Sequence, residues 1–518
     1  MSCSRIFSGD LPELMNDIIK YLQNDFSTLH SCILVNRSWC RLTIPLLWEN
    51  PFSIPTKNYN FIEIYLNNLN NESKLKLNRY KINDNLLPSN TLFNYPSFIK
   101  YLNTGSISFS IEKWFKTLKP ESRYFLQESN TFLEVKFKGL IWMLLLKLFI
   151  ENEENLYNFD IEITDDSNIY FEDFLELMLQ NPNFINNIRN FKLYIEINSL
   201  FINCRNMSIK NRISQMINSH QNLKKIVLGY KSFPFYQSLL LSNNCSNSLN
   251  TIIFYNINFC DIINLDKVFD QLNVLKSVHI VYCSSLDNDF IQQIINLTKP
   301  FKLKSLFIRE ILKIKSLELL LQKSGGYLEN IGYNFECDNG LFKQKFLELI
   351  IKYCKNIKFF ELQETDNQII YLALDLIENI RQNINYLSID IYGSSDNCDS
   401  FILRNLGQKL PLKLEYLCLN LNINTNDFEI FLKNSQNTFI NKLLINNLKA
   451  ENILSCIKEN IMKKKRVKYL AIMNSFDYID LFSLKDVVKE FEFYNIIIQK
   501  YDDLIIYADS VNFIKELD

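Results

Sequence analysis

From residue 188 onward the chain repeats one short pattern of apolar positions. Each copy has an apolar residue, two others, an apolar residue, one other and a further apolar residue. Because side chains alternate along a strand, the last two apolar positions point to the same side. The copies are Ile188/Phe191/Leu193, Leu223/Ile226/Leu228, Leu249/Ile252/Phe254, Leu275/Val278/Ile280, Leu303/Leu306/Ile308, Leu328/Ile331/Tyr333, Ile357/Phe360/Leu362, Ile384/Leu387/Ile389, Leu414/Leu417/Leu419, Ile440/Leu443/Ile445, Val467/Leu470/Ile472 and Val488/Phe491/Phe493.

The spacing of these copies predicts an array of strand–helix units. Between Leu223 and Val467 successive copies lie 25 to 30 residues apart. One short strand and one helix cannot bury an apolar face alone, whereas stacked units share a continuous core. Amphipathic stretches at 342–353 and 372–380 supply helices between the strands. The step before Leu223 is 35 residues and the step after Val467 is 21, which suits atypical terminal units.

Between residues 52 and 163 the pattern is less regular. The spacing predicts helices at 59–69, 95–102, 111–118 and 140–149, strands at 132–137 and 159–163, and a loop at 83–90. The chain is therefore expected to contain an N-terminal helical module (8–51), a helical connector (52–130) and a repeat array (131–518).

The N-terminal module is expected to form three short amphipathic helices. Pro12 suits the first turn of a helix, and Leu14, Ile18 and Leu22 recur every four residues as an apolar stripe that Met15 and Ile19 widen. The module carries more apolar surface than three short helices can bury on one another. Two interpretations stay open: a helical cap on the larger domain, or a docking module whose apolar face binds a partner.

The sequence of the N-terminal module resembles the F-box family. The family's landmarks are matched in order by the residues Leu11, Pro12, Ile18, Tyr21, Leu22, Leu29, Cys32, Leu34, Val35, Arg37, Trp39, Leu47 and Trp48. The later repeats resemble leucine-rich repeats. The amino-acid sequence around His30 is similar to that of fungal F-box proteins. The resemblance implies an α/β fold: a three-helix F-box, a helical connector and a leucine-rich-repeat solenoid with parallel strands on the concave side and helices on the convex side.

This resemblance implies a substrate receptor of a Skp–cullin–F-box ubiquitin ligase. The partners would be a Skp-type adaptor, through it the cullin and RING subunits, and a target protein on the concave repeat face. The residues expected to bind the adaptor are Leu11, Pro12, Ile18, Leu22, Leu29, Val35, Trp39, Leu47 and Trp48. The alternative is a repeat-based scaffold or inhibitor that binds a protein outside any ligase, with the N-terminal helices as a cap.

Residues that flank the inward apolar positions of each strand are expected to lie on the opposite face of the sheet. Aromatic residues and arginine on a rigid sheet are common anchors of protein recognition. The expected target-binding residues are Tyr255, Phe307, Arg309, Phe359, Tyr386, Tyr416, Tyr469 and Tyr494. The competing interpretation is that aromatic residues simply favour strands.

Composition narrows the range of possible functions and cellular locations. The 56 basic and 57 acidic residues give a net charge of −1, which argues against a nucleic-acid surface. The 12 cysteines form no regular framework, and the longest apolar run, 140–150, is too short to span a membrane. We therefore expect reduced thiols and a cytoplasmic or nuclear location, or both.

No catalytic or cofactor-binding motif is found, so we expect neither enzyme activity nor a cofactor or metal. His30, His220 and His279 are each expected to be surface or half-buried residues. The basic cluster Lys463–Arg466 precedes the strand at Val467. It is either a helix-to-strand loop or a nuclear-import signal.

Overall fold

The computed structural model describes residues 12–506, with gaps at 24, 55–57, 79, 81–90, 119–130, 153–155, 165–169, 197–204, 231–242, 261–262, 335–339, 364–366, 392–395 and 450–451. The predicted loop at 83–90 lies outside the described residues. The chain forms two compact units, which we call unit 1 (Met1–Leu249) and unit 2 (Asn250–Asp518). The boundary between them falls inside the predicted repeat array.

Unit 1 begins with three helices, where the spacing predicts them. They are α2 (Pro12–Tyr21), α3 (Phe26–Ile33) and α4 (Arg37–Leu47). The Asp25 carboxylate accepts a hydrogen bond from the Thr28 backbone N–H and caps α3. The Asn36 side chain caps α4 in the same way. At the start of each of these two helices, a polar side chain therefore accepts hydrogen bonds from backbone N–H groups that would otherwise be unpaired.

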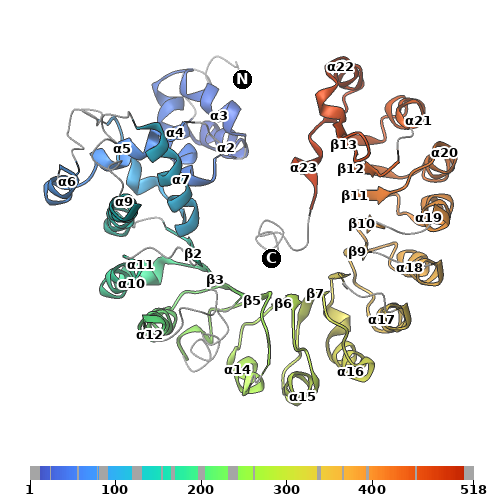
Figure 1. The fold of residues 1–518 in the computed structure, drawn as a ribbon, viewed down its shortest axis with the longest axis horizontal. Coiled ribbons are helices and arrows are strands. Elements are labelled where there is room, and N and C mark those ends of the chain that lie inside the picture. Colours follow the sequence, from blue (N-terminus) through green and yellow to red (C-terminus); the bar gives the residue numbers. More distant parts are fainter. Residues whose placement is uncertain are drawn as a thin grey trace. The chain divides into compact units, whose positions relative to one another are not determined.

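The rest of unit 1 combines helices with a parallel sheet (Figure 1). The strands pair in the order β1–β2–β3–β4. The elements are η1 (Pro51–Ser53), α5 (Phe61–Asn67), α6 (Asn71–Asn78), η3 (Tyr95–Phe98), β1 (Tyr101–Asn103), α7 (Thr104–Thr117), α9 (Thr131–Glu151), β2 (Asn158–Thr164), α10 (Phe171–Gln180), α11 (Pro182–Asn187), β3 (Asn190–Glu196), α12 (Arg205–Ser219), β4 (Lys225–Tyr230) and η6 (Asn243–Cys245).

Two predictions for unit 1 are wrong. The expected helix at 95–102 is a short 3-10 turn followed by β1, so the sheet begins inside the predicted connector. The expected strand at 132–137 is the start of α9. Phe137 and Ile141 are fully buried four residues apart, and Glu134 pairs with Lys138 at 2.7 Å with the same spacing. This helical period continues into the apolar run that follows, so residues 132–137 and the run form one continuous helix.

Unit 2 alternates strands and helices along its whole length. In Figure 1 its strands lie side by side and its helices lie along one side of them. The elements are β5 (Thr251–Tyr255), α14 (Leu265–Gln271), β6 (Ser277–Cys283), α15 (Asn288–Asn296), β7 (Leu303–Ile308), α16 (Ile314–Ser324), η7 (Gly325–Tyr327), β8 (Asn330–Tyr333), α17 (Gly340–Tyr353), β9 (Phe359–Gln363), α18 (Asn367–Asn379), β10 (Tyr386–Asp390), α19 (Asp396–Lys409), β11 (Lys413–Leu421), α20 (Thr425–Asn434), β12 (Phe439–Asn447), α21 (Leu454–Ile457), η8 (Lys458–Met462), β13 (Val467–Asn474), β14 (Ile479–Asp480), η9 (Leu481–Ser483), α22 (Lys485–Phe493), β15 (Ile497–Ile498) and α23 (Tyr501–Leu504).

The strands β5 to β13 of unit 2 are parallel and pair in chain order. The repeated apolar positions lie opposite one another: Leu387 pairs with Leu417, Leu417 with Leu443, and Leu443 with Leu470. All four are fully buried. The repeat spacing seen in the sequence therefore sets the register of the sheet, because a slip of one residue would turn these side chains to the other face.

The last predicted strand, at Val488/Phe491/Phe493, is wrong, because these residues lie in α22. Phe491 is fully buried whereas Phe493 is 83% exposed. Two residues apart on a strand, both rings would face the same side; on a helix they point in nearly opposite directions.

Every helix in the described part of the chain is too short or too polar to cross a lipid bilayer.

Candidate functional site

The three N-terminal helices have a small core of their own. Met15, Ile19, Leu29, Cys32 and Trp39 are buried together. Leu22, Leu42, Leu46 and Leu47 pack around them and are partly buried. The core side of α2 is therefore formed by Met15 and Ile19, and Leu22 packs beside them just after the helix; all three belong to the predicted stripe.

The other side of the predicted stripe of α2 faces outward. Leu14 is 41% exposed and Tyr21 is 90% exposed, and Ile18 between them is only partly buried. Just after α3, Leu34 is 78% exposed and Val35 is 46% exposed. We call Leu14, Tyr21, Leu34 and Val35 the N-terminal apolar patch. Exposed apolar side chains in adjacent elements are a common sign of a binding surface.

The C-terminal end of α4 is instead held against the rest of unit 1. The Trp48 ring lies 4.2 Å from the Tyr95 ring and 5.4 Å from the Tyr65 ring, measured between centroids. Glu49 pairs with Lys100, and its backbone carbonyl accepts hydrogen bonds from the amides of Lys100 and Tyr101. The module is thus attached at this end, while the helices α2 and α3 carry the exposed patch.

The predicted adaptor-binding residues are distributed between core and surface. Leu29 and Trp39 are buried in the module core, and Ile18, Leu22, Leu47 and Trp48 are partly buried. Val35 is exposed, Pro12 begins α2, and Leu11 lies outside the described residues. Sequence reasoning missed Leu14, Tyr21 and Leu34 as surface residues. The spacing Leu14–Ile18–Tyr21 was the available signal, because it forms one helical stripe beside the core stripe.

A second candidate surface lies on the side of the unit 2 sheet that faces away from its helices. We call it the strand face. A row of aromatic rings crosses it from β6 to β11: Tyr282, Phe307, Phe359, Tyr386 and Tyr416. Successive centroids lie 5.9, 5.7, 6.3 and 6.2 Å apart. We call these residues the aromatic row. Their spacing falls within the range in which aromatic pairs attract one another.

Gly332 on β8 makes this row continuous. A Cβ atom at this position would lie 2.9 Å from two ring carbons of Phe307 and 3.0 Å from the Cβ of Glu361. The Phe307 ring can therefore lie over β8 and reach Phe359 on β9. Beside it the buried Glu361 carboxylate accepts a hydrogen bond from the Tyr282 hydroxyl at 3.2 Å. The Arg309 guanidinium lies 4.9 Å from the Tyr282 ring centroid.

The predicted target-binding residues differ in exposure. Tyr255, Phe307, Phe359 and Tyr416 are buried, Arg309 and Tyr469 are partly buried, and Tyr386 is 36% exposed. Sequence reasoning missed Tyr282, which has a left-handed backbone at the end of β6. The placement of Tyr494 on a strand is wrong, because this residue ends the helix α22. Most of these rings therefore support the face by packing on one another, and Tyr386 is the most exposed member of the row.

A polar cleft of about 380 Å³ lies at the N-terminal ends of strands β2, β3 and β4. Arg189 and Lys224 line it together with the side chains of Asn186 and Asn222. The Arg189 guanidinium lies 4.9 Å from the centre of the Tyr157 ring. This lining favours an anionic group in general and does not select one ligand.

The histidines and cysteines are mostly buried. His30 is exposed as expected, but His220 and His279 are buried, which corrects the prediction. Burial raises the pKa of the Cys283 and Cys354 thiols to about 12, so these thiols stay protonated at neutral pH. In the described ranges no group of three or more His, Cys, Asp or Glu residues is placed to hold a metal ion.

The basic cluster is a helix-to-strand loop. Lys463, Lys464 and Lys465 are exposed, but Arg466 is buried and donates hydrogen bonds to the Leu432 carbonyl oxygen at 3.1 Å and to the Ser435 hydroxyl at 3.5 Å. Arg466 therefore has a structural role.

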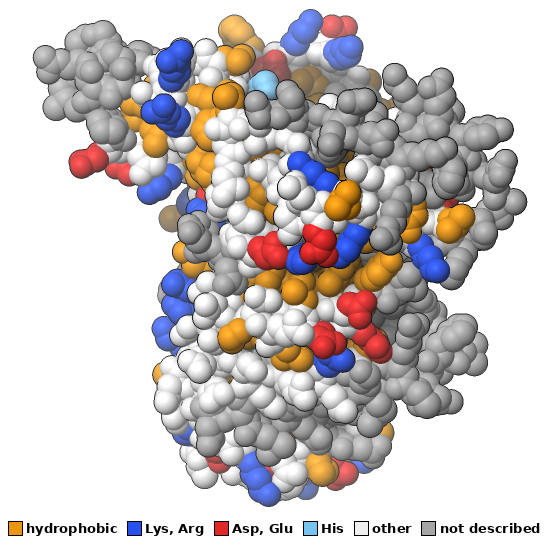
Figure 2. Space-filling view, turned by 90° about the vertical axis from the view of Figure 1, so that its left-hand side faces the viewer, with side chains coloured by type: hydrophobic (Ala, Val, Ile, Leu, Met, Phe, Trp, Pro, Cys, Tyr) orange, Lys and Arg blue, Asp and Glu red, His pale blue; other side chains and the backbone are white. Residues whose placement is uncertain are grey.

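Charged side chains of both signs are intermixed on the side of the molecule seen in Figure 2. No protein-family model matches the chain, and no curated protein is significantly similar to it.

Proposed function

We propose that this protein is the substrate-recognition subunit of a Skp–cullin–F-box ubiquitin ligase. The helices α2 to α4 act as the F-box and bind a Skp-type adaptor, which links the chain to the cullin and RING subunits. The strand–helix units of unit 2 act as leucine-rich repeats and hold a target protein for ubiquitination. The chain itself contributes proximity, and the transfer chemistry belongs to other subunits. With this function it works in the cytoplasm, the nucleus or both.

One observation carries the proposal. The N-terminal module has a closed core and an attached end, yet Leu14, Tyr21, Leu34 and Val35 remain exposed on α2 and just after α3. A module that served only as a cap would turn its surplus apolar residues toward the domain it covers. These four residues also belong to the stretch whose sequence resembles an F-box.

The repeat spacing supports the second half of the proposal. Strands β5 to β13 pair in parallel in chain order, with a helix or helical turn in most of the connections between them. Parallel strands joined by helices at 25- to 30-residue steps are the arrangement that leucine-rich repeats use. Such arrays bind partners through the rigid face formed by their strands.

The direct test is binding of the purified chain to a Skp-type adaptor. The informative variant is Tyr21→Ala/Leu34→Ala, because both side chains are almost fully exposed and their loss leaves the core intact. The matched control is Leu75→Ala/Leu412→Ala, which removes two exposed apolar side chains elsewhere. We expect sub-micromolar binding by the parent and the control, and at least tenfold weaker binding by the patch variant.

The alternative function is a protein-binding scaffold or inhibitor whose N-terminal helices form a cap. The packing of Trp48 on Tyr65 and Tyr95 favours it, since this contact ties the module to the following helices. Absence of adaptor binding by a folded parent chain would refute the ligase function and leave this alternative.

A further inference from the structure

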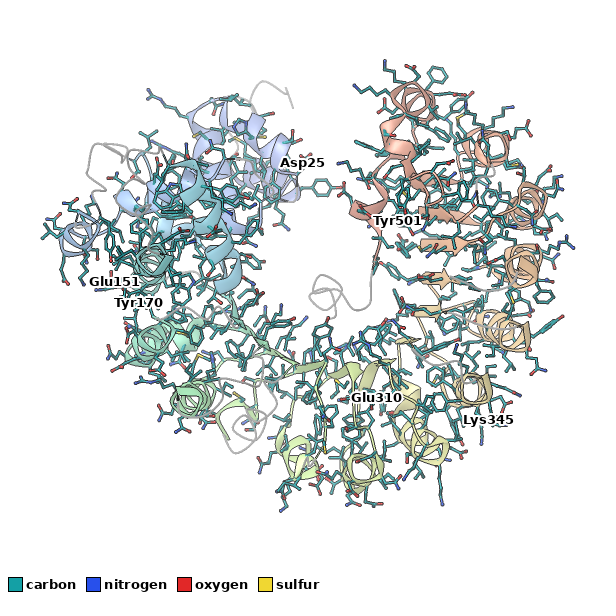
Figure 3. The ribbon with its side chains drawn as sticks, viewed as in Figure 1. Asp25, Glu151, Tyr170, Glu310, Lys345 and Tyr501 are labelled. Carbon is teal, nitrogen blue, oxygen red and sulfur yellow. The ribbon has the colours of Figure 1, made fainter. Side chains whose placement is uncertain are left out.

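The chain's own C-terminal segment, Gln499–Ile506, lies on the strand face of β11, β12 and β13. Its side chains Tyr501 and Leu504 are buried there in one cluster with Tyr416, Cys418, Leu444 and Ala471. In Figure 3 the labelled Tyr501 lies on the side of these strands opposite to the helices. Part of the face assigned above to target binding is therefore occupied.

Hydrogen bonds hold this segment at three points. The backbone amide of Gln499 donates to the Leu470 carbonyl oxygen at 3.1 Å, and β15 just before it pairs with β13. The amide of Tyr501 donates to the Asp480 carboxylate at 2.9 Å. The amide of Ile506 donates to the Tyr416 hydroxyl at 3.0 Å. Residues Tyr501–Leu504 of the segment form the single helical turn α23, which places Tyr501 and Leu504 on the same side of it. Backbone groups of the segment are thus recognised along with its side chains, as in other peptide-binding surfaces.

The part of the strand face that lies beneath the segment is unusually apolar. Cys418, Leu444 and Ala471 are paired neighbours on β11, β12 and β13, and all three are apolar or nearly so. The small side chain of Ala471 and the thiol of Cys418 leave room for the Tyr501 ring, whose hydroxyl lies 3.5 Å from the Cys418 sulfur. Asp502 and Asp503 between the two anchors are exposed. The recognised pattern is therefore Tyr-x-x-Leu with tolerant positions between the anchors.

The occupied region continues into the aromatic row. Tyr416 lies under the segment and also stacks on Tyr386, which is 36% exposed. A peptide seated on β11 to β13 would therefore lie next to the aromatic row.

We propose that the strand face of β11 to β13 is a binding groove for a target peptide that presents Tyr-x-x-Leu anchors on one helical turn, as α23 does. In this proposal the segment Gln499–Ile506 occupies the groove as an intramolecular competitor, which the target displaces. The inference rests on the proposed role of the strand face in target binding. It makes no use of adaptor binding, so the two can fail separately.

The first measurement detects whether the groove opens. In the Tyr501→Ala/Leu504→Ala variant both anchors are lost, and the Cys418 thiol beneath them becomes accessible. We expect iodoacetamide to alkylate Cys418 at least ten times faster in this variant than in the parent. The rate is followed by mass spectrometry of peptides from the alkylated chain. Cys354 is the internal control, because it is equally buried in the core after α17 and should keep its rate.

The second measurement detects recognition in trans. A fluorescent peptide with the sequence of residues 497–506 should bind the double variant and bind the parent at least tenfold more weakly. The same peptide with alanine at both anchor positions should not bind either chain. Failure of the first peptide to bind a folded double variant would overturn the proposal and make the segment a fixed part of the fold.

If circular dichroism shows that the double variant is unfolded, amide hydrogen exchange of the parent chain tests the proposal instead. Exchange at the amides of Gln499, Tyr501 and Ile506 that is faster than exchange along β12 supports a segment that opens locally. Equal protection of the segment and β12 would overturn the proposal, because the segment would then leave only on global unfolding.

Discussion

The hydroxyl of Tyr416 accepts a hydrogen bond from the backbone amide of Ile506 at 3.0 Å, although 90 residues separate the two in the sequence. The Tyr416 ring is fully buried and stacks on Tyr386. Burial raises the pKa of the Tyr416 hydroxyl well above its usual value, because the charged phenolate would be poorly solvated there. One side chain thus joins the aromatic row to the C-terminal segment.

The substitution Tyr416→Phe should isolate this hydrogen bond, because it keeps the ring and its stacking. We expect the free energy of unfolding to fall by about 1 kcal/mol, the usual net value of one such bond. Urea denaturation followed by circular dichroism measures the change. Tyr478→Phe is the control: that side chain is 84% exposed, and its hydroxyl can bond to water in either state. Equal effects of the two substitutions would contradict the assigned role.

The substitution Gly332→Ala should disturb the aromatic row. The added Cβ would meet the Phe307 ring at 2.9 Å, so the ring must move off β8 and lose its contact with Phe359. We expect a loss of about 1–3 kcal/mol in the free energy of unfolding, as for other overpacked sites. The matched control is Gly326→Ala, because a Cβ at that position has no neighbour within 4 Å. A difference in melting temperature between the two variants tests the prediction.

His220 should make unit 1 sensitive to mild acid. Burial lowers the pKa of its imidazole from 6.5 to about 4 in the folded chain. Because the unfolded chain binds the proton more tightly, the stability that His220 contributes is complete above pH 6.5. It is lost as the pH falls from 6.5 toward 4. At pH 5 the loss amounts to about 2 kcal/mol.

The substitution His220→Gln should remove this part of the pH dependence. The measurement is the free energy of unfolding at pH 7.5 and pH 5 for the parent and the variant. A variant at position 220 that keeps the full dependence would assign the effect to other groups.

Arg466→Ala should destabilise unit 2, whereas Lys464→Ala should not. The buried Arg466 guanidinium bonds to the Leu432 carbonyl oxygen and the Ser435 hydroxyl, and its loss leaves buried acceptors without donors. We expect a cost of about 1–3 kcal/mol in thermal or urea unfolding. Lys464 is exposed in the same loop, so it provides a charge-matched comparison. An equal loss of unfolding free energy in the two variants would show that the charge of the cluster matters, and not the buried contacts of Arg466.

The strand positions of the repeats were predictable from the sequence because they depend on a local pattern. Leucine or isoleucine at fixed spacing marks each strand from β3 to β13, and the register follows from the same positions. Two strand predictions are wrong: the one at 132–137, outside the repeated pattern, lies in α9, and the last copy of the pattern, Val488/Phe491/Phe493, lies in α22. A few apolar positions fit the helical and the strand period alike when few residues are counted.

The surfaces could not be predicted to the same extent. The sequence places both Leu14 and Met15 in the apolar stripe of α2, and only packing against Leu29 and Trp39 decides that Met15 faces the core while Leu14 is exposed. On unit 2 the sequence identified Tyr416 as a residue of the strand face, which it is. It gave no indication that Tyr501 covers it, because that contact joins segments far apart in the chain.

The sequence by itself determined the repeating strand–helix order, the alternation of faces and the three N-terminal helices, because each depends on residues close together in the chain. Only the tertiary structure decided which apolar residues remain exposed, which aromatic rings support one another, and where the C-terminal segment lies. These features depend on the surfaces that distant segments share, and the side chains of Tyr21, Phe307 and Tyr501 acquire their different environments only when those segments pack.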